Sequence, residues 1–412
     1  GPIPLEFDQG AVLLSRAPLR LIGSEADDIQ LLPKDDHWAG VVVLQTGTDS
    51  ESLLRHVVIR GTTGVQRQGW ITTGGMTFYE SPSVLEYVRL LDLNADEALN
   101  IVRSVFSVSD SEFGNLAADA LDLDSSQGTV ERCFFHDVGG DGECRAREKD
   151  LLEDVDLLRV RGRGLCALAG SIMQLANSRL TQVALGIVAQ DMSRVTVRDV
   201  SVEGASIAGL AAYLEQQVGG TASIEAEGVT LERCAAQALP QVGSRISLNG
   251  RQILPVELDV EQLKARLQTQ GQAKPLDYRL GSSIRLTGYD LYPSHPESGD
   301  KLYLLLRWEA EASIDQDYTI FAHLLNEAGE RVAQRDSMPR DNALPTSRWV
   351  AGQPVEELRA VSLPPDLPAG AYRLSLGMYD YITGERLRIV DGGGQLVPGE
   401  AIALDEVVHI SR

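Results

Sequence analysis

The sequence lacks the features of several large protein classes. No window approaches the ~18 uninterrupted apolar residues of a membrane-spanning helix, so no membrane insertion is expected. Positive charge is scarce: 37 Lys and Arg side chains stand against 59 Asp and Glu, which gives a net charge of −22. A field this negative repels phosphate backbones, so nucleic acid is not an expected partner. The four cysteines have no CxxC spacing, which argues against a zinc site.

The sequence also lacks the short motifs of nucleophilic and nucleotide chemistry. GxSxG, HExxH, a P-loop and a GxGxxG between strand and helix are all missing. The six histidines have no spacing that pairs them with the acidic residues discussed below. A serine hydrolase, a zinc protease and a nucleotide-binding enzyme are therefore excluded as interpretations.

A repeat of about 22 residues fills the first part of the chain. The segment Val108-Ser-Asp-Ser-Glu-Phe113 recurs as Val130-Glu-Arg-Cys-Phe-Phe135 and as Leu152-Glu-Asp-Val-Asp-Leu157. With small insertions the pattern continues in both directions over roughly residues 5–252. A fixed period indicates stacked units that bury a shared core.

Each repeat consists of short alternating runs rich in β-branched residues and separated by Gly, Asn or Asp, without a helical stripe. The LxxLxLxxN pattern of leucine-rich repeats is absent, which leaves a parallel β-helix with three strands per coil. The pattern resembles the right-handed parallel β-helix superfamily of pectate lyases and polygalacturonases. The segments Leu13–Leu19, Gly74–Ser81 and Ala98–Ser104 are similar to a β-helix region appended to exported bacterial spore-coat kinase-like (CotH) proteins.

The pattern changes after the repeat. Asp259 can cap a short helix that follows it, and residues 255–275 are expected to link the domains or to close the open end of the β-helix. From residue 276 to 412, alternating runs with turn signals predict an antiparallel β-sandwich of the immunoglobulin-like or jelly-roll kind. The runs Phe321–Leu325 and Leu376–Asp380 resemble accessory modules of bacterial membrane glycosyltransferases. The predicted fold is thus all-β: a β-helix over residues 1–254, a linker helix and a sandwich.

An acidic strip is the densest polar feature that the repeat brings together. Residues 22 apart occupy equivalent places on successive coils, about 4.8 Å apart, so like residues form files on one face. The strip consists of three files and one flanking residue: Glu97, Asp119 and Asp141; Asn100, Asp122 and Cys144; Arg103, Ser125 and Arg147; and Asp124. Asp122 and Asp124 are two apart on one strand, so their side chains are expected to share a face.

Three chemical roles are open for this strip. The resemblance to polygalacturonases implies hydrolysis with Asp122 or Asp124 as acid and Asp119 as base, although that family's companion His and Arg-x-Lys motifs are not found in register. A lyase would use Arg103 as base, with Asp119, Asp122 and Asp141 holding Ca²⁺. Without catalysis, the carboxylates could bind Ca²⁺ or the hydroxyl groups of a neutral glycan. They could also simply satisfy the backbone at tight turns.

Other candidate residues lie outside the strip. Arg60 and Trp70 are candidate ligand-binding residues in the early coils. Five aromatic side chains are candidate sugar platforms if exposed: Trp70, Tyr79, Trp349, Tyr379 and Tyr381. Cys144 and Cys166 are 22 apart and should be neighbours on adjacent coils. They form either a disulfide, as would suit an exported protein, or a pair of buried thiols.

The resulting interpretation is an exported or surface-associated bacterial protein whose signal or anchor has been removed. It is expected to recognise or scaffold extracellular polysaccharide or cell-envelope material without catalysis. A polysaccharide lyase, glycoside hydrolase or epimerase that uses the acidic strip is the alternative. A rigid spacer for a partner domain outside this sequence is a third interpretation.

Overall fold

The computed structural model describes residues 3–47, 50–67, 70–146, 149–214, 220–268, 274–293, 295–340, 342 and 344–411. The chain forms two compact units, Gly1–Val260 and Glu261–Arg412, and each is described by itself. Within the described ranges, no helix is long and apolar enough to cross a bilayer.

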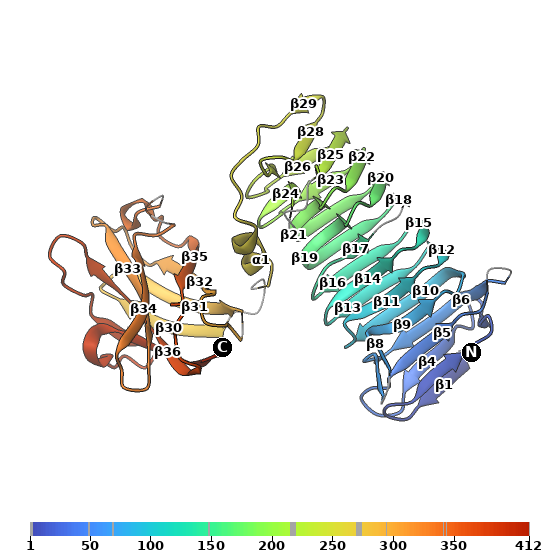
Figure 1. Cartoon of the computed structure of the whole chain (residues 1–412), viewed down its shortest axis with the longest axis horizontal. Coiled ribbons are helices and arrows are strands. Elements are labelled where there is room, and N and C mark those ends of the chain that lie inside the picture. Colours follow the sequence, from blue (N-terminus) through green and yellow to red (C-terminus); the bar gives the residue numbers. More distant parts are fainter. Residues whose placement is uncertain are drawn as a thin grey trace. The chain divides into compact units, whose positions relative to one another are not determined.

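The first unit is a parallel β-helix (Figure 1), in which each coil adds one strand to each of three parallel sheets, called faces 1, 2 and 3. Face 1 contains β1 (Ile3–Phe7), β4 (Ile29–Pro33), the second half of β6 (Ser52–Arg60), the second half of β10 (Ser83–Leu93), β13 (Glu112–Leu116), β16 (Phe134–Val138), the first parts of β19 (Asp156–Leu168) and β21 (Arg179–Gln190), β23 (Ser201–Glu203) and β26 (Thr230–Glu232).

The other two faces are built in the same way. Face 2 contains β2 (Val12–Ser15), β5 (Gly40–Leu44), β9 (Gly74–Tyr79), β11 (Glu97–Val102), β14 (Asp119–Asp124), β17 (Glu143–Ala146), the second parts of β19 and β21, β24 (Ala208–Tyr213) and β27 (Ala238–Pro240). Face 3 contains β3 (Arg20–Ile22), the first halves of β6 and β10, β12 (Val105–Ser109), β15 (Gln127–Glu131), β18 (Lys149–Glu153), β20 (Ile172–Ala176), β22 (Arg194–Arg198), β25 (Ser223–Glu227) and β28 (Arg245–Leu248).

The strand registers follow the period read from the sequence. Phe113 pairs with Phe135, 22 residues on, and Phe135 pairs with Leu157 after another 22. All three side chains are 1% exposed, and the two phenylalanine rings stack with centroids 4.6 Å apart. Because equivalent residues of successive coils meet inside, the repeat builds one continuous core. The predicted all-β fold is confirmed.

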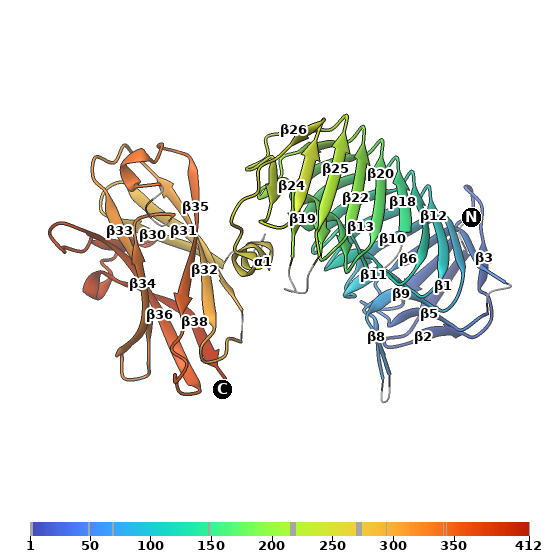
Figure 2. The ribbon, with the colours of Figure 1, turned by 45° about the horizontal axis from the view of Figure 1, so that its top comes forward.

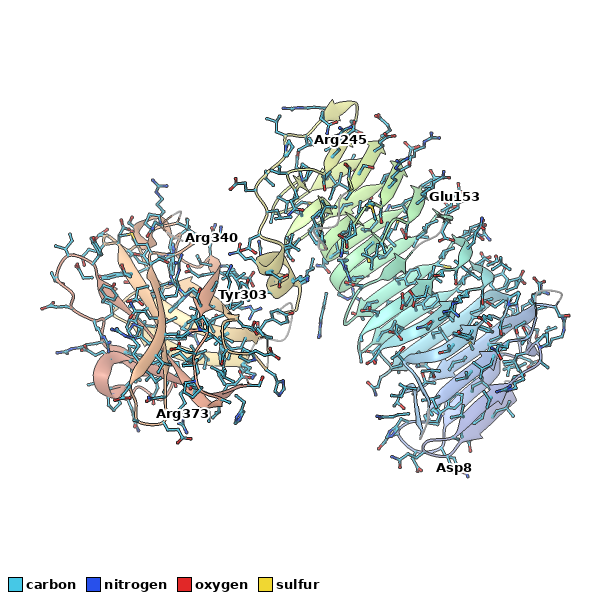
Figure 3. All side chains as sticks on the ribbon, viewed as in Figure 1. Asp8, Glu153, Arg245, Tyr303, Arg340 and Arg373 are labelled. Atoms are coloured by element: carbon cyan, nitrogen blue, oxygen red, sulfur yellow. The ribbon has the colours of Figure 1, made fainter. Side chains whose placement is uncertain are left out.

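Ladders of polar side chains occupy the corners of the coils. At the corner between faces 2 and 3, the hydroxyl of Ser104 accepts a hydrogen bond from Ser81 N at 2.8 Å, and the hydroxyl of Ser126 accepts one from Ser104 N at 3.2 Å. At the corner between faces 3 and 1, Asn177 Nδ2 donates to Oε1 of Glu153, the last residue of β18, at 3.0 Å; Glu153 is labelled in Figure 3. Figure 2 shows the coils stacked in order along the unit. Corner side chains therefore bond one coil to the next.

The regular coils are interrupted and terminated by local elements. A two-stranded hairpin, β7 (Val65–Arg67) and β8 (Trp70–Thr72), is inserted before β9. After the last face-3 strand the chain turns back, and β29 (Arg251–Gln252) pairs antiparallel with β28. Helix α1 (Val260–Gln268) follows, close to the predicted position. Its predicted role in closing the open end of the β-helix stays a prediction.

The second unit is an antiparallel sandwich. One sheet has the order β35 (Pro354–Ser362), β32 (Lys301–Ala310), β31 (Ile284–Tyr292), β30 (Lys274–Leu280), β37 (Ile389–Asp391). The other has the order β34 (Arg331–Ser337), β33 (Tyr318–Leu325), β36 (Gly370–Asp380), β38 (Ile402–Ile410). Short 3₁₀ helices occupy Thr346–Arg348 and Pro398–Glu400. Apolar side chains of both sheets share one core that includes the fully buried Trp308.

One expected sugar platform in this unit is wrong. Trp349 is only 5% exposed and belongs to the core, where its ring lies 6.3 Å from that of Trp308 and its indole nitrogen donates to Leu344 O at 3.2 Å. A large apolar ring beside Trp308 gains more from burial than from exposure. Tyr381, in contrast, is 71% exposed.

Candidate functional site: an acidic cluster on face 2

Five polar residues lie together on two adjacent strands of face 2, and we call them the acidic cluster: Glu97, Asn100, Asp119, Asp122 and Asp124. Glu97 pairs with Asp119, Asn100 with Asp122, and Val102 with Asp124. The local sequence explains this placement. The leucines at 121 and 123 point into the core and are at most 1% exposed, so the alternating side chains between and after them point outward.

Asp119 and Asp141 bond backbone groups of the following coils. The Oδ1 atom of Asp119 accepts a hydrogen bond from Asp141 N at 2.7 Å. In the same way, Oδ1 of Asp141 accepts one from Arg163 N at 2.6 Å. The Arg163 guanidinium also donates to Oδ2 of Asp141, at 2.8 Å from Nε and 2.5 Å from Nη2. Asp119 and Asp141 therefore link each coil to the next by hydrogen bonds. This is the role expected as the alternative to catalysis and binding, in which the carboxylates satisfy backbone groups.

Two carboxyl groups of the cluster titrate far from their usual range. Burial raises the pKa of Asp122 to about 7, and the charges of Asp124, Glu97 and Asp119 add to the shift. Burial also raises the pKa of Asp119 to about 7, and the charge of Asp141 contributes. With pKa values near 7, Asp119 and Asp122 can each be protonated or ionised near neutral pH, so they can donate as well as accept hydrogen bonds.

Several neighbouring polar atoms are buried without a partner. Thr77 pairs with Asn100 on the adjacent strand, and the two side chains are 4% and 8% exposed. Thr77 Oγ1, Asn100 Oδ1 and Glu97 Oε2 find no hydrogen-bond partner among the described residues. A buried polar atom without a partner typically costs about 1–3 kcal/mol. The packing of the coils does not explain why these polar side chains are buried in this part of face 2.

Arg103 lies at the corner after β11 and faces other groups. Its Nη1 donates to the Tyr79 hydroxyl at 2.7 Å and lies 3.3 Å from a carboxylate oxygen of Glu80. Its guanidinium carbon is 5.5 Å from the centre of the Tyr79 ring. The guanidinium is thus held by Tyr79 and Glu80, and the role of Arg103 as the base of a lyase stays a prediction.

The predicted calcium ligands do not form a metal site. Within the described part of the chain, no group of three or more His, Cys, Asp and Glu side chains is arranged to hold a metal ion. Both carboxylate oxygens of Asp141 bond Arg163, and one of Asp119 bonds a backbone N–H. The set Asp119, Asp122 and Asp141 therefore does not fit Ca²⁺, which takes six to eight oxygen ligands.

The remaining predicted residues lie elsewhere. Arg60, on face 1, forms an ion pair with Asp92 and does not join the acidic cluster. The backbone of Trp70 belongs to β8, but its side chain is outside the described residues. Cys144 and Cys166 are register neighbours, and Cys166 is disulfide-bonded. The side chain of Cys144 also lies outside the described residues.

Comparison with known proteins gives distant structural matches only. Neither a protein-family model nor a curated protein matches the sequence. The full-length tailspike protein 2 of Escherichia coli O157:H7 bacteriophage CAB120 is similar at 10% identity, over 97% of this chain and 67% of that chain, with a TM-score of 0.31. The gp42 tailspike of Acinetobacter phage vb_AbaP_AS12 is similar at 10% identity, over 98% and 75%, with a TM-score of 0.30.

The catalytic domain of a GH87 alpha-1,3-glucanase, solved in complex with nigerose, is similar at 10% identity with a TM-score of 0.28. The match covers 60% of this chain and 63% of that domain, which is less than two thirds of its length. We therefore assign the fold and the candidate site from the strand registers and side-chain contacts of this chain.

Proposed function

We propose that this chain is a glycan-binding protein of the cell surface or extracellular space, and that the acidic cluster binds the hydroxyl groups of a neutral polysaccharide. The observation that carries the proposal is the geometry of the cluster: outward carboxyl groups on two paired strands, beside buried polar atoms that have no hydrogen-bond partner among the described residues. The pKa of Asp122, raised to about 7, adds a carboxyl that can hold a proton near neutral pH. A protonated carboxyl donates and a carboxylate accepts, which matches neighbouring sugar hydroxyls. The negative charge of the cluster disfavours uronate and sulfate groups.

The disulfide bond of Cys166 supports an exported location. Disulfides persist in oxidising compartments and are rare in the cytosol. The sandwich would then serve as an accessory module, as its similarity to such modules of bacterial membrane glycosyltransferases suggests. The likeness of the β-helix to the spore-coat kinase-like proteins is likewise kept as part of this proposal.

Glycoside hydrolysis is the second candidate, and the raised pKa of Asp122 favours it. A general acid needs a proton at the working pH, which Asp122 would hold. Asp124 would be the base: two residues along one strand span about 6.6 Å, near the lower end of the ~6.5–9.5 Å that separates the carboxyl groups of inverting enzymes. The predicted base, Asp119, fits less well, because its pKa is also about 7 and it bonds Asp141 N. Binding without catalysis therefore ranks first.

A panel of neutral oligosaccharides, with oligogalacturonate as the acidic comparison, separates these functions. Wild type should bind a neutral glycan without releasing reducing or unsaturated ends, and Asp122→Ala should weaken binding at least about tenfold, because a hydrogen bond to a charged or protonated carboxyl is lost. Thermal shift, calorimetry and end-group assays give the readouts.

Glu225→Ala is the matched control, because Glu225 is exposed in β25 on face 3, away from the acidic cluster, and should leave affinity unchanged. Reducing ends without unsaturation that vanish in Asp122→Ala would make the chain a hydrolase, and unsaturated ends that vanish in it would make the chain a lyase. Failure of wild type to bind any glycan would contradict the proposal and favour a structural spacer.

A further inference from the structure

A second groove lies on the β-helix, away from the acidic cluster, at the corner between faces 3 and 1. Its volume is about 960 Å³, and we call it the corner groove. Successive coils line it, and its side chains include His56, Tyr87, Asp110, Arg132 and Phe134. Three successive strand pairings lead from the coil of His56 to the coil of Phe134. At the spacing of paired strands, these two coils are about 14 Å apart along the coil axis.

Two aromatic side chains at this corner sit in a strained conformation. His56 and Tyr87 have φ angles of 52° and 56°, in the left-handed region. In later coils the same corner is occupied mostly by Asp or Asn, which adopt this region more readily: Asp110, Arg132, Asp154, Asn177 and Asp199. A tyrosine there is costly, and Tyr87 is also 48% exposed. Burial therefore does not account for the tyrosine ring at this position.

The rings form two platforms along the groove. Tyr87 stacks on His56, with ring centroids 4.8 Å apart and planes within 5°. Phe134 is 38% exposed and stacks on His136, also at 4.8 Å. The coil of Tyr87 is two strand pairings from the coil of Phe134, because Arg89 in the first coil pairs with Glu112, and Glu112 pairs with Phe134. The two platforms therefore lie about 10 Å apart along the coil axis. Flat apolar ring faces that are both exposed and held in place suit the flat apolar faces of sugar rings.

The charges of the groove indicate which sugars it accepts. Arg89 forms an ion pair with Asp28. Arg132 donates to both oxygens of Asp110, at 2.8 and 2.9 Å, and this bonding lowers the pKa of Asp110. Both guanidinium groups are therefore already neutralised, and the lining carries four carboxylates against two guanidinium groups. Uronates, sulfated sugars and nucleic acids would be repelled, whereas neutral hydroxyl groups would find donors and acceptors.

We propose that the corner groove binds a neutral oligosaccharide, with Tyr87 and Phe134 as stacking platforms. The site is separate from the acidic cluster: it uses other faces, other residues and aromatic stacking instead of a protonated carboxyl.

Calorimetric titration of the full chain with neutral gluco-, manno- and galacto-oligosaccharides of three to five residues tests this proposal. Tyr87→Asn and Phe134→Ala should each weaken the binding event of the corner groove at least about tenfold, as loss of an aromatic anchor typically does, and leave that of the acidic cluster unchanged. Tyr87→Asn relieves the left-handed backbone, so its unfolding midpoint should not fall along with its affinity. Ile172→Ala removes an apolar side chain of similar exposure, 42%, from β20 on face 3, outside the groove lining, and should bind like wild type.

Each alternative result decides the matter. Wild-type affinity in both groove variants would overturn the proposal, as would a wild type that binds none of these oligosaccharides. Loss of binding in Asp122→Ala but not in the groove variants would leave glycan binding to the acidic cluster alone. Loss in the groove variants but not in Asp122→Ala would support the corner groove and contradict the function proposed for the cluster.

Discussion

Replacing Asp122 with Asn should raise the free energy of unfolding by about 2 kcal/mol at pH 8. The folded protein raises the pKa of this carboxyl from 3.8 to about 7, mainly by burial. Each pKa unit corresponds to about 1.4 kcal/mol, so the full shift is worth about 4 kcal/mol, and we halve it because solvent still reaches the side chain. Asn is nearly isosteric and has no charge to bury.

The pH dependence has a definite sign. Between about pH 4 and pH 7 the folded state binds more protons at Asp122 than the unfolded state does. Stability therefore falls as the pH rises through this window, and it levels off above pH 7. Urea unfolding from pH 4.5 to 8 should show this slope in wild type and a smaller slope in Asp122→Asn. Asp119 still contributes to the variant's slope, since its pKa is raised as well.

Asp156→Asn provides the control for this experiment, because Asp156 is exposed on face 1. It should keep the wild-type slope. Identical slopes in wild type and Asp122→Asn would show that the Asp122 carboxyl is ionised in the folded protein at neutral pH. The chemistry assigned to the acidic cluster would then lose its basis.

Replacing Arg163 with Met should lower the free energy of unfolding by about 3 kcal/mol. The guanidinium donates two hydrogen bonds to Asp141, and the two side chains are only 21% and 13% exposed. Removal of one partner leaves a carboxylate that is poorly solvated and uncompensated, which typically costs about 3–5 kcal/mol for a fully buried pair. Denaturant unfolding of the full chain at pH 7 measures the change.

The chain contains a matched control for this ion pair. Arg159 donates to both oxygens of Asp137, at 2.6 and 2.7 Å, also 22 residues apart, but its side chain is 49% exposed and that of Asp137 is 40% exposed. Arg159→Met should therefore cost less than about 1 kcal/mol. Equal losses in the two variants would contradict the structural role of the Asp141–Arg163 pair, and Asp141→Asn should recover part of the loss in Arg163→Met.

The period of the repeat made the fold predictable from sequence. Equivalent residues of successive repeats pair with one another, so the period fixes the strand register. The 22-residue spacing of Phe113, Phe135 and Leu157 therefore predicts that these side chains lie next to one another in the core. The sandwich was predicted from strand alternation, and its core includes the fully buried Trp308. Burial of Trp349 was missed, because the segment before β35 has no alternation that would show its direction.

The roles within the acidic strip were less predictable. Spacing correctly placed Glu97 beside Asp119 and Asn100 beside Asp122. It could not show that Asp119 and Asp141 bond backbone N–H groups of the next coil, because this depends on the turn geometry before each strand. Arg163 was overlooked although it follows Asp141 by 22 residues, the one signal that could have revealed it.

The corner groove was missed for a related reason. His56 and Tyr87 pair across an irregular offset of 31 residues, so the 22-residue pattern does not align them. Their left-handed backbone and their stacking are properties of the corner, which has no sequence signature when the residue is not Gly, Asn or Asp.

The most direct test of the account is a crystal structure of the full chain with the neutral oligosaccharide of highest affinity. The account predicts a sugar hydroxyl within hydrogen-bond distance of the Asp122 carboxyl on face 2. If saturating oligosaccharide left face 2 without a bound sugar, or occupied only surfaces remote from Asp122, the assignment of the acidic cluster as the glycan site would be contradicted.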